Sequence, residues 1–169
     1  MGKNKPIVVI GLMGSGKSTA GRLIAGALGL PFSDSDPFLK GKYGGSAAEI
    51  AAREGADVLH EREAEHVIKE LSGEPKVVAA AASTVENAAA REAMRGALVI
   101  WLDADDAVLA ERMRSGDHRP DFSPAAMRAR REPLFRGVAD LTYDVGVLKP
   151  EEVLAAVLRD MGLPATGQG

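Results

Sequence analysis

The chain has 169 residues, of which 46% are hydrophobic and 27% are charged, and its formal net charge at pH 7 is -3. This length and composition are typical of one soluble globular domain, and the slight negative charge excludes a general binder of nucleic acid or of anionic membranes, which needs a sustained basic surface. Cysteine is absent, which excludes disulfides, thiolate metal sites and a cysteine nucleophile.

The N-terminal segment does not have the pattern of a signal peptide or a membrane span. Only the apolar run from Ile7 to Ile10 separates the basic start from Gly11, and this run is far too short for either. We therefore expect a cytoplasmic protein with no membrane partner and no nucleic-acid partner, and we expect it to be a monomer.

Short apolar runs alternate with longer helical patterns along the chain. The expected order is strand Ile7 to Ile10, helix Lys17 to Leu28, strand Pro31 to Ser33, several helices up to Leu71, strand Val77 to Ala80, helix Val85 to Arg95, strand Leu98 to Leu102, helix Ala104 to Arg114, strand Leu141 to Val145 and helix Pro150 to Met161. Strands that alternate with helices and are apolar throughout indicate an α/β fold with a parallel sheet covered on both faces. No long linker interrupts this order, so we expect a single domain over residues 1–163 and a disordered tail over 164–169.

A phosphate-binding motif follows the first predicted strand directly. The eight residues from Gly11 to Ser18 match the P-loop pattern GxxxxGK(S/T), and the first predicted helix begins inside the motif. In such a loop, backbone N–H groups and the helix N-terminus bind phosphates, the lysine reaches the outer phosphates, and the next hydroxyl binds Mg²⁺. A glycine-rich turn without a ligand is the alternative, but the complete motif in its required context favours a nucleotide site. We expect ATP and Mg²⁺ as cofactors, with these nucleotide-binding residues: Gly14, Ser15, Gly16, Lys17, Ser18 and Thr19.

A P-loop by itself does not distinguish a motor, a switch and a kinase. GTPases of similar length carry a base-reading Asn-Lys-x-Asp motif, and neither asparagine of this chain, Asn4 or Asn87, belongs to one. A kinase that acts on a small molecule therefore fits the size and the motif better.

Two carboxylates follow the second predicted strand. Asp34 and Asp36 lie where this strand should end, at the carboxyl edge where ligands bind in open parallel sheets. Residues two apart in an extended segment face the same way, so both can address the reaction centre, one toward Mg²⁺ and one toward an acceptor hydroxyl. The structural alternative is that Asp36 caps a helix starting at Pro37. The adjoining P-loop favours the functional interpretation.

A segment rich in glycine, proline and charge separates two helical stretches. Residues 114–124 show no periodicity, and we expect them to form a mobile lid. Arg119 lies in this segment without a helical neighbour to pair with, and a mobile cation is what a developing phosphoryl charge requires. Arg112 lies in a helical stretch, where a solvated charge is an equally good interpretation.

Further motifs recur at the spacing of one family. They are Gly21-Arg22 after the P-loop, Asp34-Ser35-Asp36, Gly44-Gly45-Ser46 with Glu49-Ile50 and Gly55, Arg119-Pro120, and Arg131-Glu132-Pro133-Leu134-Phe135. Together they resemble the shikimate kinase family over about Ile7 to Leu158. The resemblance implies a nucleoside-monophosphate-kinase-like fold, a three-layer α/β/α P-loop kinase with a five-stranded parallel sheet. It also implies phosphoryl transfer from MgATP to the 3-hydroxyl of shikimate, a small-molecule acceptor.

The resemblance implies a role for each matching residue. Ser18 and Asp34 would hold Mg²⁺. Asp36 would bind the acceptor hydroxyl and act in catalysis together with Lys17 and Arg119. Of the other arginines, Arg119 would also close onto the ATP phosphates, Arg112 would lie against the adenine, and Arg131 would bind the acceptor carboxylate.

Two departures from the family fall on the acceptor side. His60 stands where the family has a substrate-binding arginine, and a histidine offers a carboxylate fewer charged donors. Ala81-Ala82-Ser83 replaces three consecutive glycines, and an alanine held at positive φ there would cost about 1 kcal/mol. We keep His60 and Ala82 as expected acceptor-binding residues. Two alternatives stay open: a kinase of another small polyol or sugar acid, and an ATP-binding protein without transfer activity.

Overall fold

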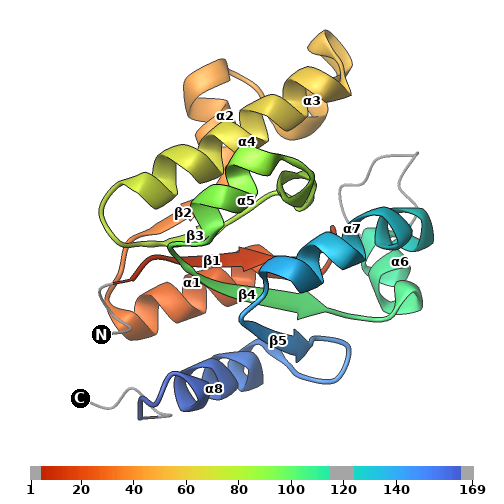
Figure 1. Cartoon of the computed structure of the whole chain (residues 1–169). Helices are drawn as coiled ribbons and strands as arrows, with labels where there is room; N and C mark the ends of the chain where they lie inside the picture. The colour runs from red at the N-terminus through yellow and green to blue at the C-terminus, as the bar shows by residue number, and fades with distance from the viewer. Residues whose placement is uncertain (1–4, 115–123, 165–169) are drawn as a thin grey trace.

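The computed structural model describes residues 5–114 and 124–164 and has three layers, with a parallel sheet between two layers of helices (Figure 1). The five strands are β1 (Ile7–Ile10), β2 (Phe32–Asp34), β3 (Val77–Ala79), β4 (Leu98–Asp103) and β5 (Leu141–Asp144). Their spatial order is β2-β3-β1-β4-β5, with β1 paired to both β3 and β4. The predicted three-layer fold with a five-stranded parallel sheet is confirmed.

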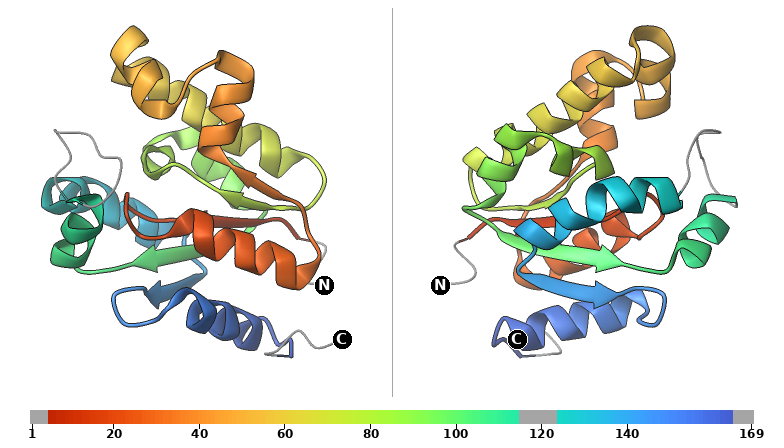
Figure 2. Two further views of the ribbon diagram at one scale, coloured as in Figure 1. Left: turned by 180° about the vertical axis from the view of Figure 1, so that it is seen from behind. Right: turned by 45° about the vertical axis from the view of Figure 1, so that its right-hand side comes forward.

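The helices cover both faces of this sheet. They are α1 (Lys17–Leu28), α2 (Ser35–Tyr43), α3 (Ala47–Glu54), α4 (Ala56–Ser72), α5 (Ala88–Met94), α6 (Asp106–Arg114), α7 (Pro124–Val138) and α8 (Pro150–Asp160), together with the 3₁₀ helix η2 (Ala82–Glu86). Figures 1 and 2 show α1 and α8 side by side on one face and α4, α5 and α7 on the other. This cover explains why all four residues of β1 are buried, as a parallel strand between two helical layers requires.

The segment after β3 differs from the prediction. A single helix from Val85 to Arg95 was expected, but η2 ends at Glu86 and α5 begins at Ala88. Asn87 separates them as the N-cap of α5, and its side chain accepts a hydrogen bond from the backbone N–H of Ala90 at 2.9 Å. The local preference of asparagine for an N-cap breaks the helical pattern at this point.

Helices α2 and α3 lie beyond the β2 edge of the sheet and have a small core of their own (Figure 1). Leu39, Ile50 and Leu59 are fully buried there, one from each of α2, α3 and α4. A capping box between Ser46 and Glu49 fixes the start of α3. This arrangement holds the α2–α3 unit against the rest of the fold through α4.

No helix in the two described stretches is both long enough and apolar enough to cross a bilayer. The predicted lid over residues 114–124 and Arg119 within it lie outside the described residues, apart from the helix ends at Arg114 and Pro124. The predicted tail over 164–169 also lies outside them, apart from Pro164.

Candidate active site

The P-loop connects β1 to α1 and has the backbone of a phosphate cradle. Gly14 and Gly16 have φ values of +89° and +87°, which only glycine adopts without strain. Gly16 is the N-cap of α1 and contributes no side-chain cap. The first N–H groups of α1 therefore stay available to an anion, and the positive end of the helix dipole points at the same place. This geometry fits a nucleotide phosphate.

Lys17 lies folded over the loop. Its Nζ donates to the carbonyl oxygens of Gly11 at 3.0 Å and Leu12 at 3.2 Å. Burial lowers the pKa of Lys17 to about 8, although the nearby carboxylates of Asp34 and Glu63 act in the opposite direction. Phosphate oxygens bound in the loop would add negative charge beside this buried ammonium group.

Ser18 and Asp34 form an oxygen pair beside the loop. Ser18 Oγ, on the first turn of α1, donates to Asp34 Oδ2 at 2.6 Å, at the end of β2. A hydroxyl and a carboxylate are ligands that Mg²⁺ accepts directly or through water. Across the described residues, no group of three or more acidic or histidine side chains could form a complete metal site. Mg²⁺ held here would thus take its other ligands from phosphates and water, as it does in kinases.

Asp36 is the second residue of α2. The capping interpretation of this residue is wrong, because Asp34 occupies the N-cap position of α2. The premise of an extended segment is also wrong, because β2 ends at Asp34. Asp36 Oδ1 accepts a hydrogen bond from the N–H of Ala47 at 3.0 Å, while Oδ2 lies 3.9 Å from Lys40 Nζ. Its carboxylate is therefore held by the start of α3.

One cavity of about 470 Å³ joins the phosphate side and the acceptor side. Of the residues predicted for the site, those that line it are Gly14, Lys17, Ser18, Asp34, Asp36, Ala82 and Arg131. The structure thus brings together residues from α1, β2, α2, η2 and α7. His60 on α4 does not line this cavity, and it lies near enough to Glu86 for its charge to lower the pKa of that carboxyl.

The acceptor wall is closed by a pair that the sequence did not suggest. Ser83 Oγ donates to Glu63 Oε1 at 2.7 Å, and both side chains are buried and line the cavity. No described residue other than glycine has positive φ, and Ala81 has φ of -62°. The replacement of three glycines by Ala81-Ala82-Ser83 therefore costs no backbone strain, and its effect is on the shape and polarity of the wall. The sequence contained one signal for Glu63, since it lies three residues after His60 on α4, and His60 was expected to bind the acceptor.

Arg131 lies in the wall with an internal partner. Its side chain is buried, and its Nε donates to Glu86 Oε2 at 2.5 Å. Arg130 Nε lies 3.3 Å from the other oxygen of the same carboxylate. Burial raises the pKa of Glu86, but the hydrogen bond and the positive charge of Arg131 outweigh this effect and lower it. Glu86 is therefore ionised at neutral pH.

Arg112 is exposed on α6, and its guanidinium is nevertheless bonded to two backbone carbonyls. Its Nη1 donates to the carbonyl of Gly14 at 3.0 Å and its Nη2 to that of Val145 at 2.8 Å. Arg112 thereby connects the P-loop to the loop after β5.

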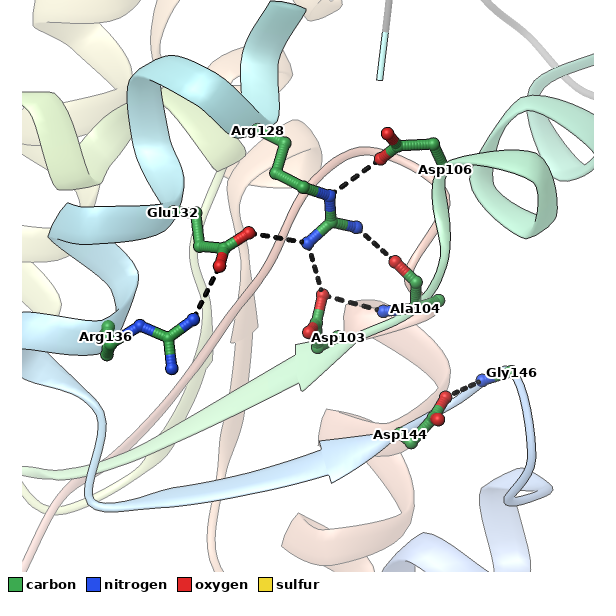
Figure 3. Close-up of polar contacts among 8 residues, drawn as sticks. All are labelled: Asp103, Ala104, Asp106, Arg128, Glu132, Arg136, Asp144 and Gly146. Carbon is green, nitrogen blue, oxygen red and sulfur yellow. Dashed lines mark hydrogen bonds and ion pairs between the residues drawn. The ribbon is translucent and has the colours of Figure 1, made fainter. Parts of the chain in front are cut away.

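A second arginine fixes the helices on either side of residues 115–123. Figure 3 shows Arg128 of α7 bonded to Asp106 at 2.7 Å, to Asp103 at 3.0 Å and to Glu132 at 3.1 Å, with a further hydrogen bond to the carbonyl of Ala104. These partners come from the end of β4, the start of α6 and α7 itself. Arg128 thus ties α7 to the base of α6.

The comparisons with known proteins identify the family of the chain. A model of the family described as shikimate kinase matches residues 13–162. The chain belongs to the shikimate kinase family. The predicted family is thereby confirmed, and with it the class of phosphotransferases with a hydroxyl acceptor.

Individual members of the shikimate kinase family resemble the chain over nearly its whole length. The shikimate kinase of Symbiobacterium thermophilum is 35% identical, with 92% of this chain and 95% of that protein covered. The shikimate kinase of Zymomonas mobilis is also 35% identical, with 95% and 94% covered. The structure of shikimate kinase from Acinetobacter baumannii in complex with shikimate superposes with a TM-score of 0.81 at 26% identity, covering 92% of this chain and 94% of that one.

Proposed function

We propose that this protein is an ATP-dependent shikimate kinase, which transfers the γ-phosphoryl group of ATP to the 3-hydroxyl of shikimate. One observation carries the proposal: Lys17, the Ser18–Asp34 pair and Asp36 line one cavity, so donor and acceptor can meet there. Membership of the shikimate kinase family supports shikimate as the acceptor.

The phosphate side works by position and charge. Phosphoryl transfer needs little covalent help from the protein, so catalysis consists of alignment and of stabilising the negative charge that spreads over the transferred group. The N–H groups of residues 14–19 and the ammonium group of Lys17 supply that stabilisation. Mg²⁺, when bound, neutralises part of the charge on the β- and γ-phosphates, and Ser18 and Asp34 would hold it.

The acceptor side requires a base and a carboxylate clamp. Asp36 would accept a hydrogen bond from the acceptor hydroxyl, orient it toward the γ-phosphorus and take its proton. Arg131 would bind the carboxylate of shikimate through its Nη groups. Ala82 would form part of the wall against the ring, and His60 would act at the outer edge of the acceptor site. Arg112 against the adenine and Arg119 on the phosphates stay predictions of the same proposal.

The test is acceptor-dependent release of ADP, measured with shikimate, MgATP and the purified protein. We expect turnover, and we expect Asp36→Asn to reduce kcat by about a hundredfold or more while the Kd for ATP changes little. The absence of shikimate-dependent ADP release at millimolar shikimate would contradict the proposal. Equal kcat values for the wild type and Asp36→Asn would remove Asp36 from catalysis.

A kinase of another small polyol or sugar acid is the second candidate. It is favoured by His60, which lies outside the cavity lining, and by the pairing of Arg131 with Glu86. A panel of hydroxy acids and polyols in the same assay separates the two, because turnover of shikimate alone rules out the second candidate. Acceptor-dependent turnover of any kind also rules out a protein that binds ATP without transferring its phosphate.

We further propose that the protein works as a monomer in the cytoplasm. Lys17, Asp36 and Arg131 line one cavity of a single copy of the chain, which supports a site that needs no partner subunit. Gel filtration at assay concentrations tests the oligomeric state, and a dimer whose dissociation abolishes turnover would contradict the proposal.

A further inference from the structure

Glu86 contacts the acceptor site indirectly, through Arg131. It ends η2, the short helix whose first residues line the cavity, but Glu86 itself does not line it. Its two carboxylate oxygens face two arginines, with Oε2 2.5 Å from Arg131 Nε and Oε1 3.3 Å from Arg130 Nε. Arg131 is the partner that also faces the cavity.

The charges of the cavity make Arg131 decisive for an anionic acceptor. Lys17 and Arg131 are the two cationic side chains among the described lining residues, and Lys17 lies on the P-loop where the phosphates bind. The carboxylates of Asp34, Asp36 and Glu63 line the same cavity. An acceptor carboxylate thus depends on the positive charge of Arg131, and Glu86 already neutralises that charge.

We propose that Glu86 determines the affinity of this enzyme for its acceptor, because it competes with the acceptor carboxylate for the positive charge of Arg131. The inference rests on the proposed function, since it takes the acceptor to carry a carboxylate. Glu86 uses the Nε–H of Arg131, so the four N–H groups on Nη1 and Nη2 are left for the acceptor. The acceptor carboxylate can therefore still form hydrogen bonds to the Nη groups of Arg131. Its electrostatic attraction to the guanidinium is weaker, because Glu86 already offsets part of the positive charge.

The substitution Glu86→Gln isolates this effect. Glutamine has the same size and keeps an oxygen that can accept the Nε–H of Arg131, but it carries no charge. Arg131 would therefore keep its orientation and lose its competing anion. Without the acceptor, the Glu86→Gln protein lacks the ion pair to the buried Arg131 and is less stable than the wild type. When the acceptor binds, its carboxylate becomes the ion-pair partner of Arg131 and restores this stability.

The experiment measures shikimate binding by calorimetry without ATP, and the KM values for shikimate and ATP by ADP release. In Glu86→Gln we expect the Kd and the KM for shikimate to fall about fivefold, with the KM for ATP unchanged. We also expect a lower melting temperature without shikimate and a larger upward shift at saturating shikimate. The matched control is Glu92→Gln on α5, which removes an exposed acid paired with Arg95 and should leave all values as in the wild type.

The outcomes separate this inference from the proposed function. Turnover of shikimate by the wild type with an unchanged or weakened Kd in Glu86→Gln overturns the inference and leaves the function intact. Tighter shikimate binding by Glu86→Gln without turnover in any variant supports the inference and overturns the function. If neither the wild type nor Glu86→Gln binds or turns over shikimate, both are wrong.

Discussion

Among the single residues of the site, Lys17 is a lysine whose charged form is disfavoured by burial. Lys17 has a pKa of about 8 because burial disfavours its ammonium form, so the group is partly neutral at pH 8. Phosphates bound in the P-loop would lie near Nζ and would raise this pKa. Nucleotide binding and protonation of Lys17 are therefore linked.

We expect ATP binding at pH 8 to take up a fraction of a proton, and binding at pH 6.5 to take up none through Lys17, which is already charged there. Calorimetry in buffers of different ionisation enthalpy measures this uptake. Lys17→Arg is the control, since arginine is protonated throughout and should abolish the difference. Equal uptake in both proteins at pH 8 would show that another group is responsible.

A second titratable residue acts on stability alone. His66 of α4 is fully buried, and its Nε2 is hydrogen-bonded to Ser33 Oγ of β2 at 2.9 Å. Burial lowers the pKa of His66 from 6.5 to about 4, although the charges of Glu70 and Asp34 act in the opposite direction. The folded state thus holds a neutral imidazole under conditions in which the unfolded chain takes up a proton.

The sign of the pH effect follows from this difference. Above pH 6.5 both states are neutral at His66, and as the pH falls toward 4 the unfolded state is increasingly favoured by its extra proton. As the pH falls from 6.5 to 4, we expect protonation of His66 in the unfolded chain to lower the free energy of unfolding by up to about 3 kcal/mol. Urea unfolding at several pH values measures it against His66→Gln, which does not titrate. Parallel curves for the two proteins would contradict the prediction.

At the scale of elements, the close approach of α1 to β2 depends on one glycine. A Cβ at Gly21 would lie 2.7 Å from Cε1 of Phe32, whose ring also packs under the guanidinium of Arg22 at 5.1 Å. Gly26, one and a half turns later on the same helix, has open space where its Cβ would be. The two glycines therefore have different physical roles.

We expect Gly21→Ala to destabilise the fold by about 1–3 kcal/mol, because the helix must move away from β2 or the Phe32 ring must shift. The matched variant Gly26→Ala should stabilise it by about 0.5–1 kcal/mol through helix propensity. Urea unfolding compares them directly. Equal changes in unfolding free energy for the two variants would show that helix propensity, and not packing against Phe32, determines the effect of alanine at position 21.

At the scale of the whole molecule, the protein has two cores of unequal size. The large one surrounds the sheet, whereas three fully buried residues, Leu39, Ile50 and Leu59, form the small one under α2 and α3. Asp36 and Ala47, which are bonded to each other, belong to this smaller unit. The carboxylate of Asp36 is thus positioned by the less extensively packed part of the fold.

We expect the amides of α3 to exchange with solvent by a local opening, with a lower free energy than the amides of β1 and β4. Native-state hydrogen exchange measures these opening free energies. A saturating acceptor should reduce the difference between α3 and the sheet, because the acceptor contacts both the α2–α3 unit and the rest of the fold. Uniform protection across α3 and the sheet would contradict the division. Leu59→Ala should lower the protection of α3 more than that of β1, by the loss of buried contacts.

Much of the fold could be predicted from the sequence for reasons that are local, and several of the predicted site residues line one cavity. The P-loop needs glycines at fixed positions between a strand and a helix, so its motif is contiguous and can be recognised in the sequence. The predicted strand Ile7–Ile10 and helix Lys17–Leu28 match β1 and α1 residue for residue. Asp36 was placed correctly in the cavity but for a wrong reason, because α2 starts before it and turns it toward Ala47.

Local sequence was enough to predict the phosphate cradle, the buried parallel sheet and the family, since each depends on the chemistry of neighbouring residues. The hydrogen bonds between Ser83 and Glu63, which are 20 residues apart, and between Arg131 and Glu86, which are 45 residues apart, could be found only in the folded chain. Such pairs depend on how α4, η2 and α7 pack together. A charged side chain distant in sequence finds its partner through that packing, because burial makes any unpaired charge costly.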